Sequence, residues 1–340
     1  MNRLLAALVM IVSVFGVTAR EITVMQFNVW QEGTSVEGGF EAMADEIAAL
    51  SPDIVMLSEV RNYHGTRFCD RIVKALADRG VTYHSFYSYD TGLLSRTEIT
   101  DSVTIFPCVD DHGSVYKLIT EIDGNRVAAY TAHLDYLNDT YYEVRGYDGN
   151  SWKEMEPVTD VAELTRRNLL SRRDEGAQVI VADVALEKEK GSLIFLGGDL
   201  NEPSGLDWTE ATAQTADHHG VVIDWPSVKI LREGGLVDAY RAVYPDPVTH
   251  PGYTYPSSNP AVGVNRLSWA MKADERDRID YLFYVPDSRL EIEAAWIAGP
   301  QDDIIKGERV ATEWGQRDIT PPLGIWPSDH RAVMARFRLK

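Results

Sequence analysis

The stretch Leu193-Ile194-Phe195-Leu196-Gly197-Gly198-Asp199-Leu200-Asn201 is a short apolar run that ends in polar residues. A run of this length, rich in branched and aromatic residues and closed by glycine and aspartate, is typical of a β-strand. Eight further runs of the same kind occur along the chain, at residues 22–29, 53–59, 103–107, 115–122, 126–134, 279–285, 290–297 and 332–338. The sequence therefore predicts a fold dominated by strands.

Helical spacing is confined to a few segments between these runs. Residues 40–50 place Phe40, Met43 and Ile47 on one face, residues 68–76 repeat the spacing, and the longest helix is expected at about residues 160–189. Many strands with few helices favour sheets packed face to face, with helices outside, over a doubly wound nucleotide-binding sheet. No repeat or linker divides the chain, so residues 20–340 are predicted to form one α+β domain.

The N-terminus resembles an export signal. Arg3 supplies a basic start, residues 4–17 an apolar run, and Val17-Thr18-Ala19 a cleavage site with small residues. The run is shorter than the roughly 20 residues that cross a bilayer. We therefore expect residues 1–19 to be a signal peptide, the mature chain to begin at Arg20, and the protein to be periplasmic or extracellular.

Charge and cysteine content limit the possible functions. The chain has 33 basic and 52 acidic residues, a formal charge of −19, which disfavours holding nucleic acid through a stripe of lysine and arginine. The only cysteines, Cys69 and Cys108, could pair in an oxidising compartment or be small buried hydrophobes. Two cysteines alone do not provide a zinc site. The oligomeric state is left open.

Polar residues stand at the ends of the predicted strands. They are Asn28, Glu59, His133, Asp199 with Asn201, Asp280, and Asp329 with His330. Carboxylates and amides on a rigid sheet edge are oxygen ligands suited to Mg²⁺, Mn²⁺ or Ca²⁺, and histidines beside them can transfer protons. His218 and His219 are interpreted as solvated loop residues.

Seven short motifs resemble those of the endonuclease/exonuclease/phosphatase superfamily, in the order that the family has them. They are Gln26-Phe27-Asn28-Val29-Trp30, Ser58-Glu59-Val60, Gly92-Leu93-Leu94-Ser95-Arg96, Thr131-Ala132-His133-Leu134, Gly198-Asp199-Leu200-Asn201, Arg278-Ile279-Asp280-Tyr281 and Ser328-Asp329-His330. The resemblance implies a DNase I-like, four-layer α/β sandwich, with two packed, mostly antiparallel sheets and helices outside.

The resemblance also implies a role for each matching residue. Glu59 would be the principal ligand of a divalent metal, Mg²⁺ or Mn²⁺ with Ca²⁺ as a further candidate, and Asn28 and Asp329 would support it. His330 would be the general base, with its imidazole held by Asp280.

The remaining family positions would act on the phosphate. Asp199 would orient the attacking water, Asn201 would donate to a phosphate oxygen, and His133 would stabilise or protonate the leaving group. Asp277, three residues before Asp280, is an alternative partner for His330, although only Asp280 leads directly into the aromatic strand.

The motifs indicate a phosphoester hydrolase and leave the substrate open. Residues 274–278 differ from the stretch that is usual in inositol phosphatases, and an exported protein is an unexpected DNA-repair enzyme. We predict an exported, sphingomyelinase-like phosphodiesterase acting on a phosphorylated glycan or lipid head group. A secreted DNase I-like nuclease is the enzymatic alternative, and a carbohydrate- or lipid-binding protein on the same scaffold is the non-enzymatic one.

Two long segments without periodicity, residues 135–158 and 245–277, are expected to be functional loops. The first carries Tyr136, Arg145 and Trp152, and aromatic rings with an arginine suit a sugar or head group attached to phosphate. Glycines 146 and 149 would let the chain turn and aim Arg145 at a phosphate oxygen. Arg96 either reaches a phosphate or forms an ion pair at a strand end; the aromatic residues either bind substrate or pack the loop.

Overall fold

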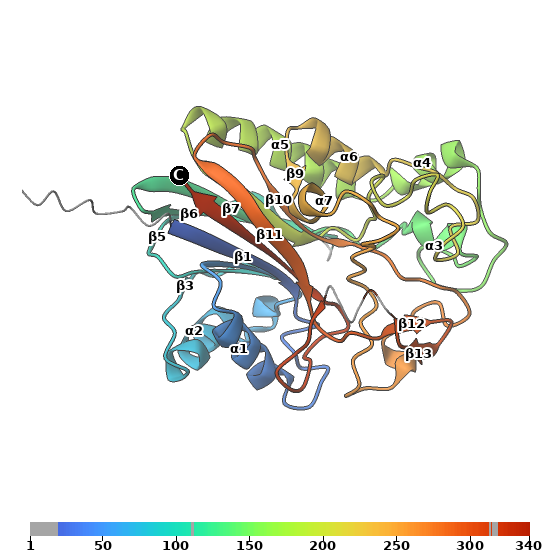
Figure 1. The fold of residues 1–340 in the computed structure, drawn as a ribbon, viewed down its shortest axis with the longest axis horizontal. Coiled ribbons are helices and arrows are strands. Elements are labelled where there is room, and N and C mark those ends of the chain that lie inside the picture. Colours follow the sequence, from blue (N-terminus) through green and yellow to red (C-terminus); the bar gives the residue numbers. More distant parts are fainter. Residues whose placement is uncertain (1–19, 110–111, 313, 315–318) are drawn as a thin grey trace, which may run out of the picture.

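The computed structural model describes residues 20–109, 112–312, 314 and 319–340, which form two facing sheets (Figure 1). The first sheet has the strand order β14-β11-β15-β1-β2-β4-β3. Its strands are β1 (Arg20–Asn28), β2 (Ile54–Ser58), β3 (His84–Ser85), β4 (Thr91–Ser95), β11 (Leu290–Ala298), β14 (Ile319–Thr320) and β15 (Ala332–Leu339). The predicted signal peptide lies outside the described residues.

The second sheet has the order β5-β6-β7-β8-β10-β9. Its strands are β5 (Ile99–Phe106), β6 (Ser114–Ile122), β7 (Asn125–His133), β8 (Leu193–Asp199), β9 (Val237–Asp238) and β10 (Asp280–Tyr284), and a separate hairpin joins β12 (Asp303–Ile305) to β13 (Glu308–Val310). Only the β1–β2, β7–β8 and β11–β14 pairs are parallel among the described strands. The expected mostly antiparallel sandwich is confirmed.

Helices cover both outer faces, which completes four layers (Figure 1). Helices α1 (Gly39–Leu50) and α2 (Phe68–Asp78) pack on the first sheet, whereas α5 (Arg173–Glu189) and α6 (Pro226–Glu233) pack on the second. Between the sheets lies a core that includes Val24, Met56 and Phe195. The other helices are α3 (Thr140–Val144), α4 (Val161–Asn168), α7 (Ala239–Val243) and the 3₁₀ turns η1 (Asn62–His64) and η2 (Val264–Arg266).

The single helix predicted at residues 160–189 is wrong, because two helices, α4 and α5, occupy it. Asp160 caps α4 near the predicted start, accepting from the backbone N–H groups of Ala162 and Glu163. The chain then turns at residues 169–172, where the backbone N–H of Arg172 donates to Asp135. Arg173 donates to Asp139 and to three carbonyls of residues 135–138. These tertiary contacts interrupt the helix, although the apolar residues on either side of the turn continue with helical spacing.

All nine predicted strands are present, and the short strands β3, β4, β9, β12, β13 and β14 were not predicted. Runs of two to five residues have too little length to show a period. Cys69 is buried and is a thiol, since its Sγ donates to the carbonyl of Phe86. None of the helices in the described residues is long and apolar enough to cross a membrane.

Strand register brings the polar strand ends to one edge of the sandwich. Asn28 is paired with Ser58, next to Glu59, in the parallel β1–β2 pair. His133 is paired with Asp199 in the parallel β7–β8 pair, and antiparallel β10 places Asp280 opposite Asp199. Parallel neighbours carry their C-terminal residues to the same edge, so local sequence pattern and sheet topology together build the site.

Candidate active site

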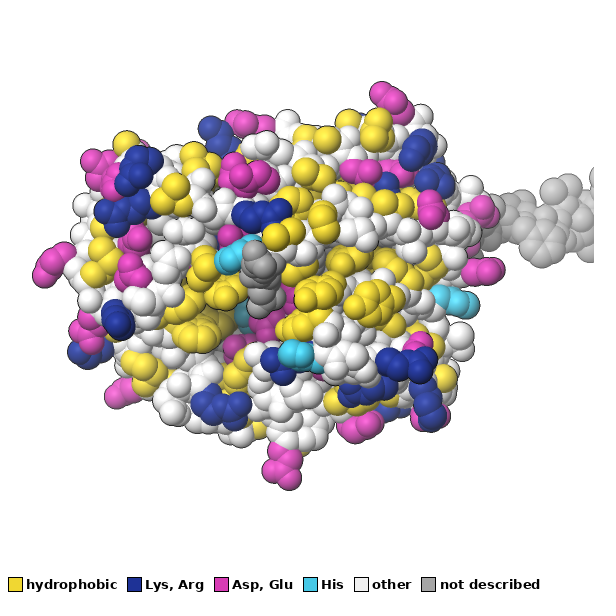
Figure 2. Space-filling view, turned by 180° about the vertical axis from the view of Figure 1, so that it is seen from behind, with side chains coloured by type: hydrophobic (Ala, Val, Ile, Leu, Met, Phe, Trp, Pro, Cys, Tyr) yellow, Lys and Arg dark blue, Asp and Glu magenta, His cyan; other side chains and the backbone are white. Residues whose placement is uncertain are grey.

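A pocket of about 280 Å³ opens at this edge of the sandwich. Figure 2 shows acidic side chains in a hollow that is bordered by hydrophobic ones. The lining side chains fall into three groups: acidic Glu59, Asp90, Asp139, Asp199 and Asp329; aromatic Trp30, Tyr63, Tyr136, Tyr141, Tyr142, Trp152, Tyr255 and Trp269; and Gln31, Arg61, His133, Asn201, Ile279 and His330. The pocket is thus negatively charged with aromatic walls.

One histidine of the pocket, His330, is held by a buried carboxylate. Nδ1 of His330 lies 2.8 Å from Oδ2 of Asp280, and Oδ1 of Asp280 accepts from Gln26 Nε2 at 3.0 Å. A carboxylate is an acceptor, so Nδ1 carries the hydrogen and Nε2 is the nitrogen left for chemistry. The expected Asp280–His330 contact is confirmed.

The second histidine is held in the same way. Nδ1 of His133 lies 2.5 Å from Oδ2 of Asp90, which immediately precedes β4. Burial lowers the pKa of His133, but the adjacent Asp90 raises it, and the result is a pKa of about 10. His133 is therefore a cationic proton donor at neutral pH.

Asn28 links the first sheet to the carboxylates of the pocket. Its Nδ2 donates to Oε1 of Glu59 and to Oδ2 of Asp199, both at 2.9 Å, and lies 3.4 Å from Nε2 of His330. Its Oδ1 accepts from the backbone N–H of Trp30. The amide nitrogen of Asn28, and not its oxygen, thus faces the carboxylates, and its predicted role as a metal ligand stays a prediction.

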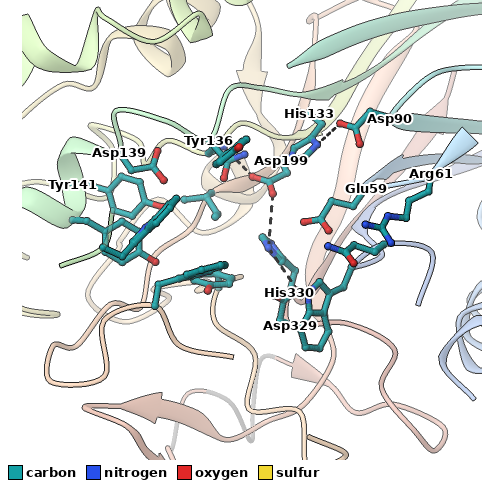
Figure 3. A pocket seen from close by; sticks show the side chains of 18 of the residues that line it. Glu59, Arg61, Asp90, His133, Tyr136, Asp139, Tyr141, Asp199, Asp329 and His330 are labelled. Carbon is teal, nitrogen blue, oxygen red and sulfur yellow. Dashed lines mark hydrogen bonds and ion pairs between the residues drawn. The ribbon is translucent and has the colours of Figure 1, made fainter. Parts of the chain in front are cut away.

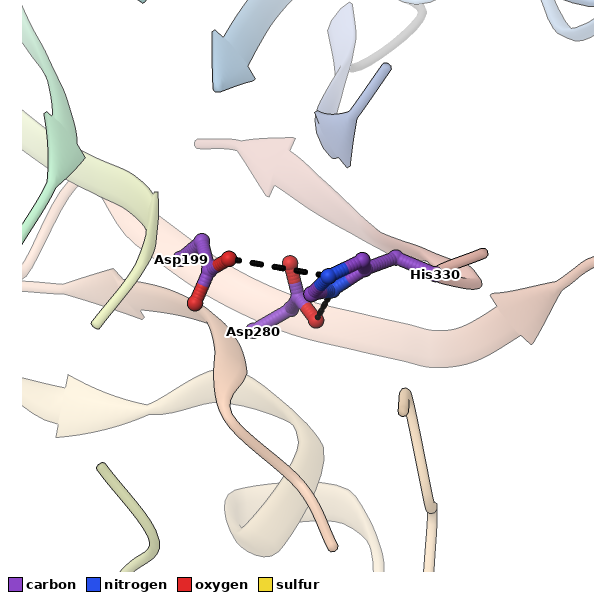
Figure 4. Close-up of side chains that lie close together, drawn as sticks. All are labelled: Asp199, Asp280 and His330. Atoms are coloured by element: carbon purple, nitrogen blue, oxygen red, sulfur yellow. Dashed lines mark hydrogen bonds and ion pairs between the residues drawn. The ribbon is translucent and has the colours of Figure 1, made fainter. Parts of the chain in front are cut away.

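Asp199, Asp280 and His330 form a group whose ligand atoms lie within 4.8 Å of one another (Figure 4). Nε2 of His330 is 3.8 Å from Oδ2 of Asp199. Although burial lowers the pKa of His330, Asp280 and Asp199 raise it well above its ordinary value. Because Asp280 already holds Nδ1, we interpret the trio as proton-handling machinery.

A cation fits better between Glu59 and Asp329. Oδ1 of Asp329 is buried and has no hydrogen-bond donor among the described residues. Burial raises the pKa of Asp329 to about 8, and the charge of Glu59 adds to this rise; burial likewise raises the pKa of Asp199 to about 6, with Asp280 contributing. A positive charge stabilises crowded carboxylates in their ionised form, and hard oxygen ligands of this kind suit a divalent cation.

The eight family positions predicted from the motifs converge on this pocket. Six of them line it, namely Glu59, His133, Asp199, Asn201, Asp329 and His330, and Figure 3 labels all of these except Asn201. Asn28 donates to Glu59, and Asp280 contacts His330. Asn201 Nδ2 donates to the carbonyl of Leu134 at 3.0 Å. Of the predicted substrate residues, Tyr136 and Trp152 also line the pocket.

Arg96 is not at the site, contrary to one of the two predictions for it. The antiparallel β2–β4 pair sets Ser95 opposite Ile54 and Thr91 opposite Ser58, so Arg96 follows the far end of β4. Its Nη1 donates to Ser51 Oγ. The near end of the same strand carries Asp90, the partner of His133, which the motif-based prediction missed.

The prediction that Arg145 faces a phosphate is also wrong. Its guanidinium is fully buried and pairs with Asp277 at 2.8 Å. Nε donates to the carbonyls of Ala216 and Asp274. Arg145 does not line the pocket. The turn at Gly146 directs the side chain inward, where it joins the insertion to residues 274–277, and the same pairing removes Asp277 as a partner for His330.

His218 is not a solvated loop residue. It is buried, and its ring stacks on Trp208 with centroids 3.7 Å apart and planes 16° from parallel. Burial, with the charge of Arg145 adding, lowers the pKa of His218 to about 2. His219 is exposed, as expected. His218 therefore packs under the insertion as a neutral aromatic ring.

Sequence reasoning missed several pocket residues, among them Asp90, Tyr255 and Trp269. Tyr255 and Trp269 belong to residues 245–277, one of the two segments expected to be functional loops. The sequence therefore predicted the loop but not which of its residues line the pocket. Asp90 immediately precedes β4, which runs antiparallel to β2 and therefore begins beside Glu59, at the end of β2. An acidic residue just before a strand is the sequence feature that could have identified it.

Known proteins resemble this chain in sequence or in fold. An uncharacterized protein of Caenorhabditis elegans, F14F9.5, is 28% identical over 274 residues, which is 78% of this chain and 79% of the relative. The structure of Danio rerio TDP2 complexed with single-strand DNA product matches with a TM-score of 0.52 and 16% identity, over 93% of this chain and 98% of that one. The human Nocturnin catalytic domain with bound sulfate matches with a TM-score of 0.51 and 16% identity, over 95% and 97%.

Both structural matches have too little identity to show more than a common fold. The family model described as the endonuclease/exonuclease/phosphatase family, in contrast, matches residues 25–330 and so spans all eight polar residues at the strand ends, from Asn28 to His330. The pocket with its two histidine–aspartate pairs lies wholly within that match. The chain belongs to the endonuclease/exonuclease/phosphatase family, a family of metal-dependent phosphoesterases and nucleases.

Proposed function

We propose that this chain is an exported, Mg²⁺- or Mn²⁺-dependent phosphodiesterase that hydrolyses a phosphorylated glycan or a phosphorylated lipid head group. The observation that carries the proposal is the pair of histidine–aspartate contacts on the two sides of Asp199, His133–Asp90 (Figure 3) and His330–Asp280 (Figure 4). In-line displacement at phosphorus needs a base for the attacking water and an acid for the leaving oxygen on opposite sides.

The chain's own groups divide the proton transfers. His330 would take the proton of the attacking water at Nε2 once a cation held by Glu59 and Asp329 offsets the carboxylate charges that raise the His330 pKa. Asp280 holds Nδ1–H and stabilises the imidazolium that results. Asp199, 3.8 Å from Nε2, is placed to orient that water. On the other side, His133 donates from Nε2 to the leaving oxygen, because Asp90 occupies its Nδ1.

Glu59 and Asp329 would hold the cation. A divalent cation supplies Lewis-acid charge to the phosphate oxygens and favours ionised carboxylates around it. Asn28 bridges Glu59 and Asp199 by donating to both. Arg61 lines the pocket beside them and can balance the charge of a phosphate.

The pocket lining supports a small, non-nucleic substrate. Among the described residues, Arg61 is the only lysine or arginine that lines the pocket, whereas five acidic side chains do. A long polyanion depends on several cationic contacts, and the chain's formal charge of −19 opposes it further. Aromatic walls suit a sugar or a head group next to the one phosphate that reacts.

Turnover of bis(p-nitrophenyl) phosphate tests the proposed chemistry. Hydrolysis should require Mg²⁺ or Mn²⁺ and stop with EDTA, and Glu59→Gln should raise the metal concentration needed for half-maximal rate. Nicking of supercoiled plasmid at low salt, at a rate equal to or above diester hydrolysis, would instead favour the nuclease. Binding of glycans or lipids without any metal-dependent turnover would favour the non-enzymatic reading.

Export has a separate test, which depends only on the N-terminal pattern of residues 1–19. The full chain should be recovered outside the cytoplasm with Arg20 as its first residue. Deletion of residues 2–19 should retain it in the cytoplasm with its catalytic activity intact. Recovery of an intact N-terminus from a membrane fraction would point to an uncleaved anchor and contradict the proposal.

A further inference from the structure

One wall of the pocket is a series of aromatic rings from two loops. Tyr136 and Trp152 have centroids 6.4 Å apart with planes 8° from parallel, and Trp152 and Trp269 have centroids 5.0 Å apart with planes at 33°. All three line the pocket. We call Tyr136, Trp152 and Trp269 the aromatic ladder. Tyr136 and Trp269 are 37% and 56% exposed, which is unusual for large aromatic side chains that serve only packing.

The ladder is held rigid by contacts between the two loops. The hydroxyl of Tyr147 accepts from the backbone N–H of Lys272 at 3.1 Å, and Lys272 Nζ pairs with Glu154 at 2.6 Å. The buried carboxylate of Glu275 accepts from the hydroxyl of Tyr142 and from the backbone N–H of Trp269. A ligand that stacks on these rings would not have to order them first, which reduces the entropic cost of binding.

Trp152 shows two features of a binding residue. Its backbone has φ of 51°, a left-handed conformation that a large side chain adopts only where surrounding contacts impose it. Its indole Nε1–H is buried and has no acceptor among the described residues. An unpaired buried donor beside a pocket is costly unless a ligand supplies the acceptor.

The ring planes indicate the shape of the ligand. Quaternary ammonium groups are held in aromatic cages, with rings at steep angles on several sides. The near-parallel Tyr136–Trp152 pair and the 33° tilt of Trp269 form an open series of faces instead. Such faces suit a flat or chair-shaped ring that stacks on them.

The polar groups near the ladder indicate the chemistry of that ring. Asp139 lines the pocket, and among the described residues only Arg173 donates a side-chain hydrogen bond to its carboxyl group. Four of the five carboxyl groups that line the pocket are assigned to the cation, to His133 or to the attacking water, which leaves the carboxyl oxygens of Asp139 as hydrogen-bond acceptors for a ligand. A ligand with several O–H donors satisfies acceptors of this kind, whereas a nucleobase offers mostly acceptors and at most one amino group. A pyranose has both the hydroxyl groups and an apolar C–H face that stacks on aromatic rings.

We propose that the aromatic ladder binds the pyranose ring of a sugar esterified to the scissile phosphate. The inference rests on the proposed phosphodiesterase function and narrows its substrate to a glycosyl phosphodiester. The sugar ring would stack on Trp152 and Trp269, donate hydroxyl hydrogens toward Asp139, and accept from the Trp152 indole N–H. Lipid head groups without a sugar would gain little from this wall.

Three p-nitrophenyl phosphodiesters test the proposal, with methyl, methyl glucopyranoside (through O6) or thymidine (through O5′) as the second ester. Because all three diesters release the same p-nitrophenolate leaving group, differences in kcat/KM among them reflect the second ester group. Trp269→Ala should lower kcat/KM about tenfold more for the glucosyl diester than for the methyl diester, mainly through KM. Leu186→Ala, which removes an equally exposed side chain (54%) from the outer face of α5, should change neither.

The other outcomes overturn the proposal. Equal wild-type kcat/KM for the glucosyl and methyl diesters would show that the ladder does not bind sugar. A preference for the thymidine diester that Trp269→Ala removes would assign the ladder to a base. If no diester is hydrolysed, the proposed phosphodiesterase function is contradicted, but sugar binding by the ladder can still be tested. The test is then calorimetric titration with the non-chromogenic methyl diester of methyl glucoside 6-phosphate. Binding weakened by Trp269→Ala supports it, and no binding to wild type refutes it.

Discussion

Asp277 and Asp280 stand three residues apart on one segment, and both are buried, yet they serve different parts of the molecule. Asp277 pairs with Arg145 and accepts from the Trp208 indole N–H, under the insertion. Asp280 pairs with His330 at the edge of the pocket. The alternation of β10 and the chain before it sends the two side chains to different neighbours, although sequence alone made either a candidate partner for His330.

The difference between the two pairs shows that the partner of a buried aspartate determines what the pair can do. A guanidinium stays charged at any pH that the protein meets, so the Asp277–Arg145 pair can only be kept or broken, and it holds two loops together. An imidazole exchanges its proton near neutral pH, so the Asp280–His330 pair can take part in a reaction. The same carboxylate in the same degree of burial is thus structural in one place and placed for catalysis in the other.

The largest effect is expected from breaking the structural pair. Arg145→Ala leaves Asp277 buried without its cation and should lower the free energy of unfolding by about 3–5 kcal/mol. Urea unfolding followed by fluorescence measures it, with Arg166→Ala, an exposed arginine on α4, as the control that should change stability little. A stable Arg145→Ala protein with a raised KM alone would return Arg145 to a role in recognition.

Breaking the catalytic pair should instead affect rate. His330→Ala should lower kcat for a phosphodiester by at least about 10²-fold, the low end for removal of a general base. Asp280→Asn should also lower kcat, because Asn in place of the carboxylate no longer fixes the Nδ1–H tautomer. Both variants should bind a non-hydrolysable phosphonate analogue. Full activity of His330→Ala would remove His330 from the mechanism.

The second histidine–aspartate pair, His133–Asp90, allows the proposed general acid to be tested separately from the general base. If His133 protonates the leaving oxygen, His133→Ala should lower kcat about 10²-fold for an alkyl diester and much less for a p-nitrophenyl diester, whose leaving group needs no proton. Rates on matched alkyl and aryl diesters provide the measurement. Equal losses on both would show that His133 stabilises phosphate charge and does not transfer a proton.

The smallest effect concerns the coupling of cation binding to pH. Asp329 has its pKa raised from 3.8 to about 8, so between these values the cation-free folded protein holds a proton that the unfolded chain does not. Its contribution to stability therefore falls as pH rises through this window, and the ionised carboxylate becomes available to a cation. Mg²⁺ should raise Tm more at about pH 8 than at about pH 5. Asp329→Asn should reduce that difference, and an equal Mg²⁺ effect at both pH values would contradict the assignment of Asp329.

The long strands and the catalytic edge were predictable from local pattern. Runs such as residues 193–199 and 126–133 bury side chains on both faces, so apolar continuity marks them, and the Asp or His that closes each run marks the C-terminal end of the strand. Packing between the two sheets explains why residue 197 is a glycine. A Cβ there would lie 2.5 Å from Met56 Sδ of the facing sheet, so the two sheets approach closely just before Asp199.

The sequence by itself determined which residues end the buried strands, because strand formation and burial leave a pattern over five to nine neighbouring residues. Tertiary structure alone decided the partners: Asp90 for His133, Arg145 for Asp277, and Trp269 for Trp152. These contacts join positions 43, 132 and 117 residues apart. Each side chain had several acceptable partners by chemistry, and only the register of the sheets and the path of the two loops selected one.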